Sequence, residues 1–241
     1  MDLHDAVAVV TGASRGIGRA VSIALAQAGT HVYGMARSAG DLDTLGDALG
    51  DRFTPLVCDV TDADAVKSAI DGVAKDAGRL DILVANAGLG RFGEVDDLSV
   101  DNWTLQVDTN LSGVFYCTRA AVPHMKAQQK AREGETAGHI VHVASIAGLI
   151  GNPKLSAYNT TKFGLRGFAE ATMKELRPYG IRTTCLYPGS VETDFQDGAG
   201  VPANPNAMQP EDLADTILHV LQMPHRTLIS EVVLRPSVTK G

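Results

Sequence analysis

The stretch AVAVVTGASRGIG, residues 6–18, decides the fold of this 241-residue chain. Its opening residues are apolar and mostly β-branched, so they predict a short buried strand. Gly12, Gly16 and Gly18 follow directly, and apolar residues then recur at helical spacing as far as Ala28. A glycine-rich turn between a strand and a helix lets backbone N–H groups approach a pyrophosphate at the positive end of the helix. The stretch therefore predicts a dinucleotide-binding turn, and a turn with a purely structural role is the alternative.

The same alternation of short apolar runs and amphipathic stretches continues along the chain. Strands are predicted over residues 6–10, 31–36, 53–60, 81–88, 139–145 and 181–189, with 228–236 as a possible further strand. Helices are predicted over residues 16–29, 42–49, 62–78, 99–130, 158–176 and 210–223. This regularity predicts an α/β fold in three layers, a doubly wound parallel sheet of about seven strands with helices on both faces. We expect one domain over residues 1–241, with the Gly- and Pro-containing stretch 195–209 as a substrate lid.

The composition limits the kinds of partner. With 21 Lys and Arg against 28 Asp and Glu, the net charge is −7, which disfavours a nucleic-acid partner. Cys58, Cys117 and Cys185 lie far apart without a CxxC pair, so we expect them to be small buried hydrophobes. His139 and His142 flank a strand and are interpreted as structural, and no histidine spacing predicts a metal site. Without a signal-peptide pattern or an apolar run of about 20 residues, we expect a cytoplasmic protein with no membrane partner.

The end of the second predicted strand bears on the choice of nucleotide. An acidic side chain there would hydrogen-bond an adenosine ribose and repel a 2′-phosphate. This chain instead has Ala36 followed by Arg37, and Arg15 stands inside the glycine turn. Two guanidinium groups without a carboxylate favour a 2′-phosphate, which predicts NADP(H) as the preferred cofactor, with NAD(H) possible. Two ordinary surface arginines are the alternative.

Tyr158 and Lys162, in the stretch YNTTK, are four residues apart and share one face of a predicted helix. Taken alone, the pair fits a core tyrosine beside a surface lysine as well as it fits a catalyst. An ammonium group favours the phenolate, as would an oxidised, cationic nicotinamide, so the pKa of Tyr158 is expected to be lowered towards the working pH. A phenol with such a pKa is able to give and take a proton as a general acid and base.

Seven short motifs follow one another along the chain. They are TGASRGIG (11–18), CDV with Asp59, NAG (86–88), Asn110, Ser145, YNTTK (158–162) and PGSVET (188–193). In this order and spacing the chain resembles the short-chain dehydrogenase/reductase family, in its single-domain branch, from about residue 5 to residue 225. The resemblance implies a Rossmann-type fold and an oxidoreductase that moves a hydride between NADP(H) and a carbonyl or secondary alcohol.

The resemblance also implies a role for each matching position. Asn110, Ser145, Tyr158 and Lys162 match the family's catalytic tetrad, with Tyr158 as general acid and base and Ser145 hydrogen-bonded to the substrate oxygen. Asp59 looks like the partner of the adenine amino group, with Val60 beside the ring. The full set of implied cofactor contacts is Gly12, Ser14, Arg15, Gly16, Ile17, Gly18, Arg37, Asp59, Val60, Asn86, Ala87, Gly88, Tyr158, Lys162, Pro188, Gly189, Val191 and Thr193.

The substrate pocket is expected beyond the carboxyl ends of the strands, near the nicotinamide. By position its wall is predicted to contain Leu89, Phe92, Ile146, Leu149, Gly189, Phe195 and Met208, with Arg91 and Lys154 near the mouth. This mainly apolar set fits a small or medium carbonyl compound with apolar substituents. Two positions depart from the family pattern. Ala85 replaces a frequent asparagine, and the ending LISEVVLRPSVTKG lacks the glycine signature of the tetrameric ketoacyl reductases.

Three alternatives remain open at this point. The chain is either a reductase, a non-catalytic NADP(H)-binding regulator, or an epimerase or dehydratase of the family's longer branch, which the short chain disfavours. Within the first reading, a 3-oxoacyl-thioester reductase is one specific substrate class. By resemblance we expect a homodimer or homotetramer, formed by the helices over 102–130 and 158–176. One side of these helices is expected to pack on the sheet and the other to form the self-association surface. The apolar or small residues on their several sides are Val114, Phe115, Cys117, Ala121, Phe163, Leu165, Phe168 and Ala169.

Overall fold

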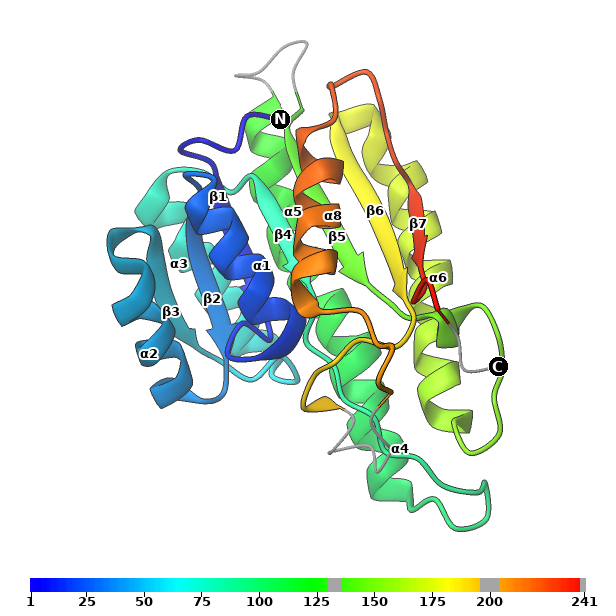
Figure 1. Cartoon of the computed structure of the whole chain (residues 1–241). Helices are drawn as coiled ribbons and strands as arrows, with labels where there is room; N and C mark the ends of the chain where they lie inside the picture. The colour runs from blue at the N-terminus through cyan, green and yellow to red at the C-terminus, as the bar shows by residue number, and fades with distance from the viewer. Residues whose placement is uncertain (130–135, 196–203, 239–241) are drawn as a thin grey trace.

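A computed structural model describes residues 1–129, 136–195 and 204–238. Its elements are β1 (Val7–Thr11), α1 (Gly16–Gln27), β2 (His31–Ala36), α2 (Ala39–Leu49), β3 (Phe53–Val57), α3 (Ala63–Ala77), β4 (Ile82–Ala85), α4 (Val100–Val107), α5 (Gly113–Gln129), β5 (Gly138–Val143), α6 (Ser156–Leu176), β6 (Ile181–Pro188), α8 (Pro210–Gln222) and β7 (Glu231–Leu234). The sheet has the order β3-β2-β1-β4-β5-β6-β7, and every neighbouring pair is parallel (Figure 1). The predicted α/β fold is confirmed.

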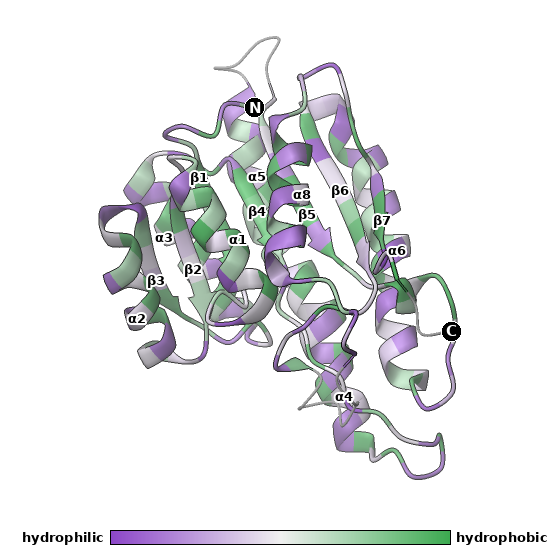
Figure 2. Cartoon of the chain, viewed as in Figure 1, coloured by the Kyte–Doolittle hydropathy of each residue, from purple (hydrophilic) through white to green (hydrophobic). Residues whose placement is uncertain are grey.

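Two apolar layers hold the helices on the sheet. On one face, Val21, Leu25 and Ile217 of α1 and α8 pack on Ala8 and Val10 of β1, together with residues of α2. On the other face, α3 and α5 pack on the alternate residues of the same strands, and α6 covers β5 and β6 beside them. Figure 2 shows the consequence, since the strands are mainly apolar and the outward sides of the helices are mainly polar. A strand covered on both faces is apolar throughout, which explains the run VAVVT in β1.

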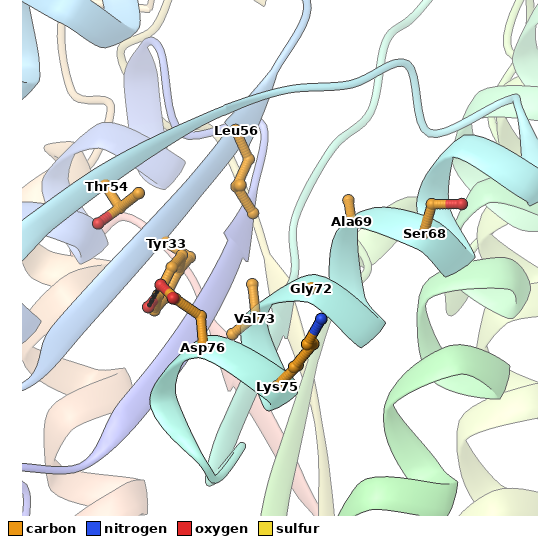
Figure 3. A pocket seen from close by; sticks show the side chains of 9 residues that line it. All are labelled: Tyr33, Thr54, Leu56, Ser68, Ala69, Gly72, Val73, Lys75 and Asp76. Atoms are coloured by element: carbon orange, nitrogen blue, oxygen red, sulfur yellow. Dashed lines mark hydrogen bonds between the residues drawn. The ribbon is translucent and has the colours of Figure 1, made fainter.

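The two edges of the sheet are formed by β3 and β7. Pro55 lies in β3, where a missing backbone N–H is tolerated because the strand has only one neighbour. A surface pocket of about 510 Å³ opens between β3 and α3, and Figure 3 shows Tyr33 and Asp76 pointing toward one another in it. The phenol of Tyr33 donates to Asp76 Oδ2 at 3.2 Å. This pocket contains none of the predicted site residues.

The structure corrects the single helix predicted over residues 99–130. In the described part of that stretch, α4 and α5 are separated by a π turn at Asp108–Ser112. Asn110 lies in this turn, is fully buried, and uses its side chain to bond another segment of the chain. Periodicity missed the break because one additional residue per turn leaves the apolar pattern on each side intact.

No helix within the described ranges is both long and apolar enough to cross a bilayer. The three cysteines are buried, as predicted.

The predicted lid over 195–209 lies mainly outside the described residues. Of its described end, Met208 forms an isolated parallel bridge with Val191, and Met208 O accepts from Glu192 N at 2.8 Å.

His139 and His142 are buried on β5, in agreement with their structural interpretation. His139 Nε2 lies 2.8 Å from Thr184 Oγ1, whereas neither ring nitrogen of His142 has a hydrogen-bond partner among the described residues. Burial lowers the pKa of His142 to about 4 and the pKa of His139 well below its usual range. Both rings are therefore neutral in the folded protein at neutral pH.

This burial predicts a loss of stability in acid. An unfolded histidine takes up a proton near pH 6.5, whereas folded His142 does so only near pH 4, so acid favours the unfolded state. The neutral His142 ring makes its full contribution to the free energy of unfolding above pH 6.5. This contribution declines as the pH falls and has decreased by about 3 kcal/mol at pH 4. His142→Leu should therefore make the free energy of unfolding less pH-dependent, by about 2 kcal/mol between pH 7.5 and pH 5.

Denaturant titrations at these two pH values measure the effect. His219→Leu on the exposed side of α8 is the matched control and should leave the pH dependence unchanged. If His142→Leu keeps the full dependence of the parent protein, another group causes the acid sensitivity.

Candidate active site

The glycine turn connects β1 to α1 at the carboxyl end of the sheet, which is the lower edge in Figure 1. Gly12 and Gly16 have φ angles of 68° and 51°, a region that side chains other than glycine rarely enter. A Cβ at Gly18 would lie 2.2 Å from Gly12 O, so only glycine permits this contact. Arg15, the N-cap of α1, makes no side-chain capping bond to the described residues. The first N–H groups of α1 therefore face outward beside a glycine backbone, as an anion site requires.

The NAG segment is held directly against this turn. Thr11 Oγ1 accepts from the backbone N–H groups of Asn86 and Ala87, both at 2.9 Å. Asn86 Nδ2 donates to Thr11 O at 2.9 Å. These bonds join the ends of β1 and β4, where the strand order of the sheet changes direction. Ligands of open α/β sheets bind at such a switch point.

Two further groups of predicted cofactor residues border the same edge. A Cβ at Gly16 would lie 3.1 Å from Thr193 Cγ2, so the PGSVET turn contacts the glycine turn. Gly189 N donates to Leu234 O at 2.8 Å and thereby joins this turn to the end of β7. Of the remaining predicted contacts, Ser14, Ile17, Pro188 and Val191 lie in or directly beside these turns. Val60 instead follows β3, where a Cβ at Gly113 would lie 2.9 Å from Val60 Cγ2.

Arg37 and Asp59 lie at the ends of β2 and β3. Arg37 Nη1 is 3.7 Å from Asp59 Oδ2, and both side chains are well exposed. Asp59 Oδ1 accepts from the backbone and hydroxyl of Thr61, which fixes the carboxylate. No carboxylate was predicted beside the arginines, and this is corrected because β3 brings Asp59 next to Arg37. Arg37 therefore leaves a weak, solvent-screened ion pair if it binds a phosphate.

The four predicted catalytic residues come from three elements. Asn110 Oδ1 and Nδ2 bond Leu89 N and Leu89 O, each at 2.8 Å. Ser145 follows β5, and Tyr158 and Lys162 lie one turn apart on α6, both buried. A Cβ at Gly88 would lie 3.3 Å from Asn110 Oδ1 and 3.7 Å from Lys162 Nζ, so the NAG segment lies against both of these side chains. The structure thus brings the four predicted catalytic residues together near the NAG segment, which in turn contacts the glycine turn.

The prediction that the pKa of Tyr158 is lowered is wrong when only the protein's own residues act on the phenol. Burial raises the pKa of Tyr158 to about 12, and the hydrogen bond with the Ser145 hydroxyl lowers it only in part. Lys162 Nζ donates to Val143 O at 3.0 Å and lies 5.6 Å from the centre of the Tyr158 ring. Burial also lowers the pKa of Lys162 to about 8, which reduces its charge in weakly alkaline solution. The phenol is therefore protonated at neutral pH.

An aromatic cluster lies beside the phenol. The rings of Phe92 and Phe195 lie 5.6 and 5.5 Å from the Tyr158 ring, and 6.2 Å from each other. A Cβ at Gly90 would lie 2.7 Å from Phe195 Cζ and 2.8 Å from Phe92 Cε1, so this glycine permits the packing. Of the other predicted wall residues, Leu89 borders Asn110, and Ile146 and Leu149 follow Ser145 directly. At the mouth, Lys154 pairs with Glu94 at 3.5 Å, and Arg91 Nη1 donates to Gly90 O.

Sequence reasoning missed two residues of this region. Thr11 joins the glycine turn to NAG, and Asn159 bonds the segment after Ser145. Thr11 lies inside the TGASRGIG motif and Asn159 inside the YNTTK motif, and membership of these motifs is the signal that could have marked them. No cluster of three or more potential metal-ligating side chains occurs in the part of the chain that the structure describes.

Comparison with known proteins adds to this geometry. Residues 6–201 match the model of a protein family described as short chain dehydrogenase. An oxidoreductase of Botryotinia fuckeliana, BOA17, is 36% identical over 187 residues, which are 77% of this chain and 66% of that protein. An alcohol dehydrogenase from the archaeon Thermococcus sibiricus, solved with 5-hydroxy-NADP, is 28% identical, with a TM-score of 0.87 and 99% of both chains covered. A 3-ketoacyl-(acyl-carrier-protein) reductase from Brucella melitensis, solved with NADH, is 26% identical, with a TM-score of 0.89 and 98% of both chains covered.

Proposed function

Because the chain belongs to the short-chain dehydrogenase family, we propose that it is an NADP(H)-dependent carbonyl reductase that also oxidises the corresponding secondary alcohol. The observation that supports the proposal is the grouping of Ser145, Tyr158 and Lys162 near the NAG segment, which contacts the glycine turn. The turn fits a dinucleotide because a side chain at Gly18 would fill it and because α1 begins without a side-chain cap. Gly12, Gly16 and the N–H groups of α1 would hold the pyrophosphate.

The bound cofactor would supply or accept the hydride. Tyr158 would give its proton to the substrate oxygen, since its raised pKa keeps it protonated at neutral pH. The Ser145 hydroxyl would stabilise the negative charge that develops on that oxygen. Lys162 and Asn110 would return a proton to Tyr158 from solvent. In the oxidising direction Tyr158 must first lose its proton, so the chain's own residues favour carbonyl reduction.

Arg37 is proposed to select NADP(H). Arg37→Ala should raise the KM for NADPH by about tenfold to a hundredfold, because a charge-assisted contact to a phosphate contributes about 1.5–3 kcal/mol. The KM for NADH should change by less than about threefold, since NADH offers no 2′-phosphate. Steady-state kinetics with each nucleotide measure both values.

Arg226→Ala, at an exposed position after α8, is the matched control and should change neither KM. Equal increases for NADPH and NADH would contradict the proposed role of Arg37. The NADH bound to the Brucella reductase makes this comparison informative, because that protein has a similar fold.

The substrate is proposed to be a carbonyl compound with apolar substituents. Phe92 and Phe195 adjoin the Tyr158 ring, and the nearby side chains of Leu89, Ile146 and Leu149 are also apolar. A second candidate is a 3-oxoacyl thioester, which the similarity to the Brucella reductase favours.

The side chains of Phe115 and Phe163 remain substantially exposed on α5 and α6, which supports self-association through these helices. Light scattering of the purified protein tests that association.

A panel of carbonyl compounds tests the proposed function. It contains diketones, ketoesters, aldehydes, sugars, steroids and acyl thioesters, and the loss of NADPH or NADH absorbance reports turnover. Turnover of apolar ketones supports the first candidate, and turnover restricted to acyl thioesters supports the second. Nucleotide binding without turnover of any compound would favour the non-catalytic regulator.

A further inference from the structure

One buried amide side chain organises the segment between Ser145 and Tyr158. Asn159 Nδ2 donates to Ala147 O at 2.6 Å and to Ile150 O at 2.8 Å. Asn159 Oδ1 accepts from Asn152 N at 3.1 Å. These three bonds connect helix α6, at the residue after Tyr158, to three backbone groups of the segment that follows Ser145. The side chain is buried, so water does not replace these partners readily.

The Ala147 residue transmits this constraint to Ser145. Its N–H donates to Ser145 Oγ at 3.1 Å, while its carbonyl oxygen accepts from Asn159. The same short turn, η3 (Ile146–Gly148), rests on the backbone of α6, because a Cβ at Gly148 would lie 2.6 Å from Lys162 O. The position of the Ser145 hydroxyl relative to the Tyr158 phenol therefore depends on how η3 is held against α6.

We propose that Asn159 is a positioning residue that sets the Ser145 hydroxyl relative to the Tyr158 phenol. The proposal rests on the proposed reductase function, in which both groups contact one substrate oxygen. Only an amide supplies both donors and the acceptor that these backbone groups need. A serine supplies one donor, and an aspartate directs a carboxylate at the carbonyl oxygens of Ala147 and Ile150, which repel it.

Kinetics of Asn159→Ser and Asn159→Asp test the proposal with the best ketone from the carbonyl panel. We expect kcat to fall by about tenfold in the serine variant and by about a hundredfold in the aspartate variant, because a displacement near 1 Å costs about this much. The affinity for NADPH, measured by fluorescence titration, should stay within about threefold, since Asn159 makes none of the contacts of the glycine turn. Asn152→Ser, in the same segment but exposed, is the matched control and should keep kcat within about twofold.

A double-mutant cycle with Ser145→Ala distinguishes positioning from general damage. If Asn159 acts through Ser145, Asn159→Ser should lower kcat little further once Ser145 is alanine. Fully additive losses, or an equal fall in NADPH affinity, would overturn the proposal. Crystal structures of the parent protein and of Asn159→Ser supply a test that needs no turnover. An unchanged separation of Ser145 Oγ and Tyr158 Oη would overturn the proposal, whereas a parent protein inactive on every carbonyl would overturn only the proposed function.

Discussion

Tyr158→Phe should lower kcat by about a thousandfold, because a positioned general acid contributes about 10²–10⁴ to the rate and phenylalanine has no proton to donate. The change removes one oxygen and keeps the ring that packs against Phe92 and Phe195. The affinity for NADPH should remain within a few-fold of the parent value.

Stopped-flow kinetics measure the rate of hydride transfer, and a separate NADPH titration measures the affinity for the cofactor. Tyr179→Phe, at an exposed ring that lies under Lys126 and far from the site, is the matched control. It should leave both quantities unchanged. Retention of most of the turnover by Tyr158→Phe would refute Tyr158 as the acid.

Gly18→Ala should destabilise the protein by up to about 3 kcal/mol, because the new Cβ would overlap Gly12 O at 2.2 Å and Asn86 Nδ2 at 2.6 Å. The first of these atoms belongs to the backbone of the glycine turn, so relief requires α1 to move away from it. If the nucleotide binds only the closed turn, the same strain lowers NADPH affinity by about a hundredfold. Denaturant unfolding and fluorescence titration measure the two effects.

Gly72→Ala supplies a control of identical chemistry. Gly72 lies in the interior of α3, and a Cβ there meets nothing within 4 Å. This change should stabilise the protein by about 0.5–1 kcal/mol, since alanine is the better helix former. Gly18→Ala with normal stability and normal NADPH affinity would show that the turn tolerates a side chain and does not hold the pyrophosphate.

Local patterns were sufficient for most of the fold. The apolar run in β1 and the glycines after it predicted the strand, the turn and α1 because all of their determinants are neighbours in sequence. The remaining strands and helices were predicted from the same alternation, and the proposed tetrad was predicted from the resemblance of the motifs to those of the short-chain dehydrogenase family. In a parallel sheet the carboxyl ends of the strands meet at one edge. Motifs that follow successive strands in the sequence are therefore expected to lie near one another in the fold.

Apart from the unbroken helix over residues 99–130, the predictions that were wrong concern interactions between distant segments. Arg37 meets Asp59 only because β2 and β3 are neighbours. The pKa of Tyr158 depends on burial by surrounding elements, and no spacing of residues reports that burial. The YNTTK motif contains Asn159 but does not reveal which backbone groups its side chain bonds, so its proposed role rests on contacts seen in the folded chain.

The π turn at Asp108–Ser112 gives the α4–α5 helix two phases. If this turn became ordinary α-helix with every residue kept, the part of the helix after it would rotate by about 100° relative to the part before it, because the π turn takes up one extra residue. Asn110 bonds Leu89, whereas Met125 and Cys117 are fixed in the core, so both halves cannot stay in place after such a rotation. The wide turn is therefore what allows Asn110 to reach Leu89 while α5 keeps its apolar side on the sheet.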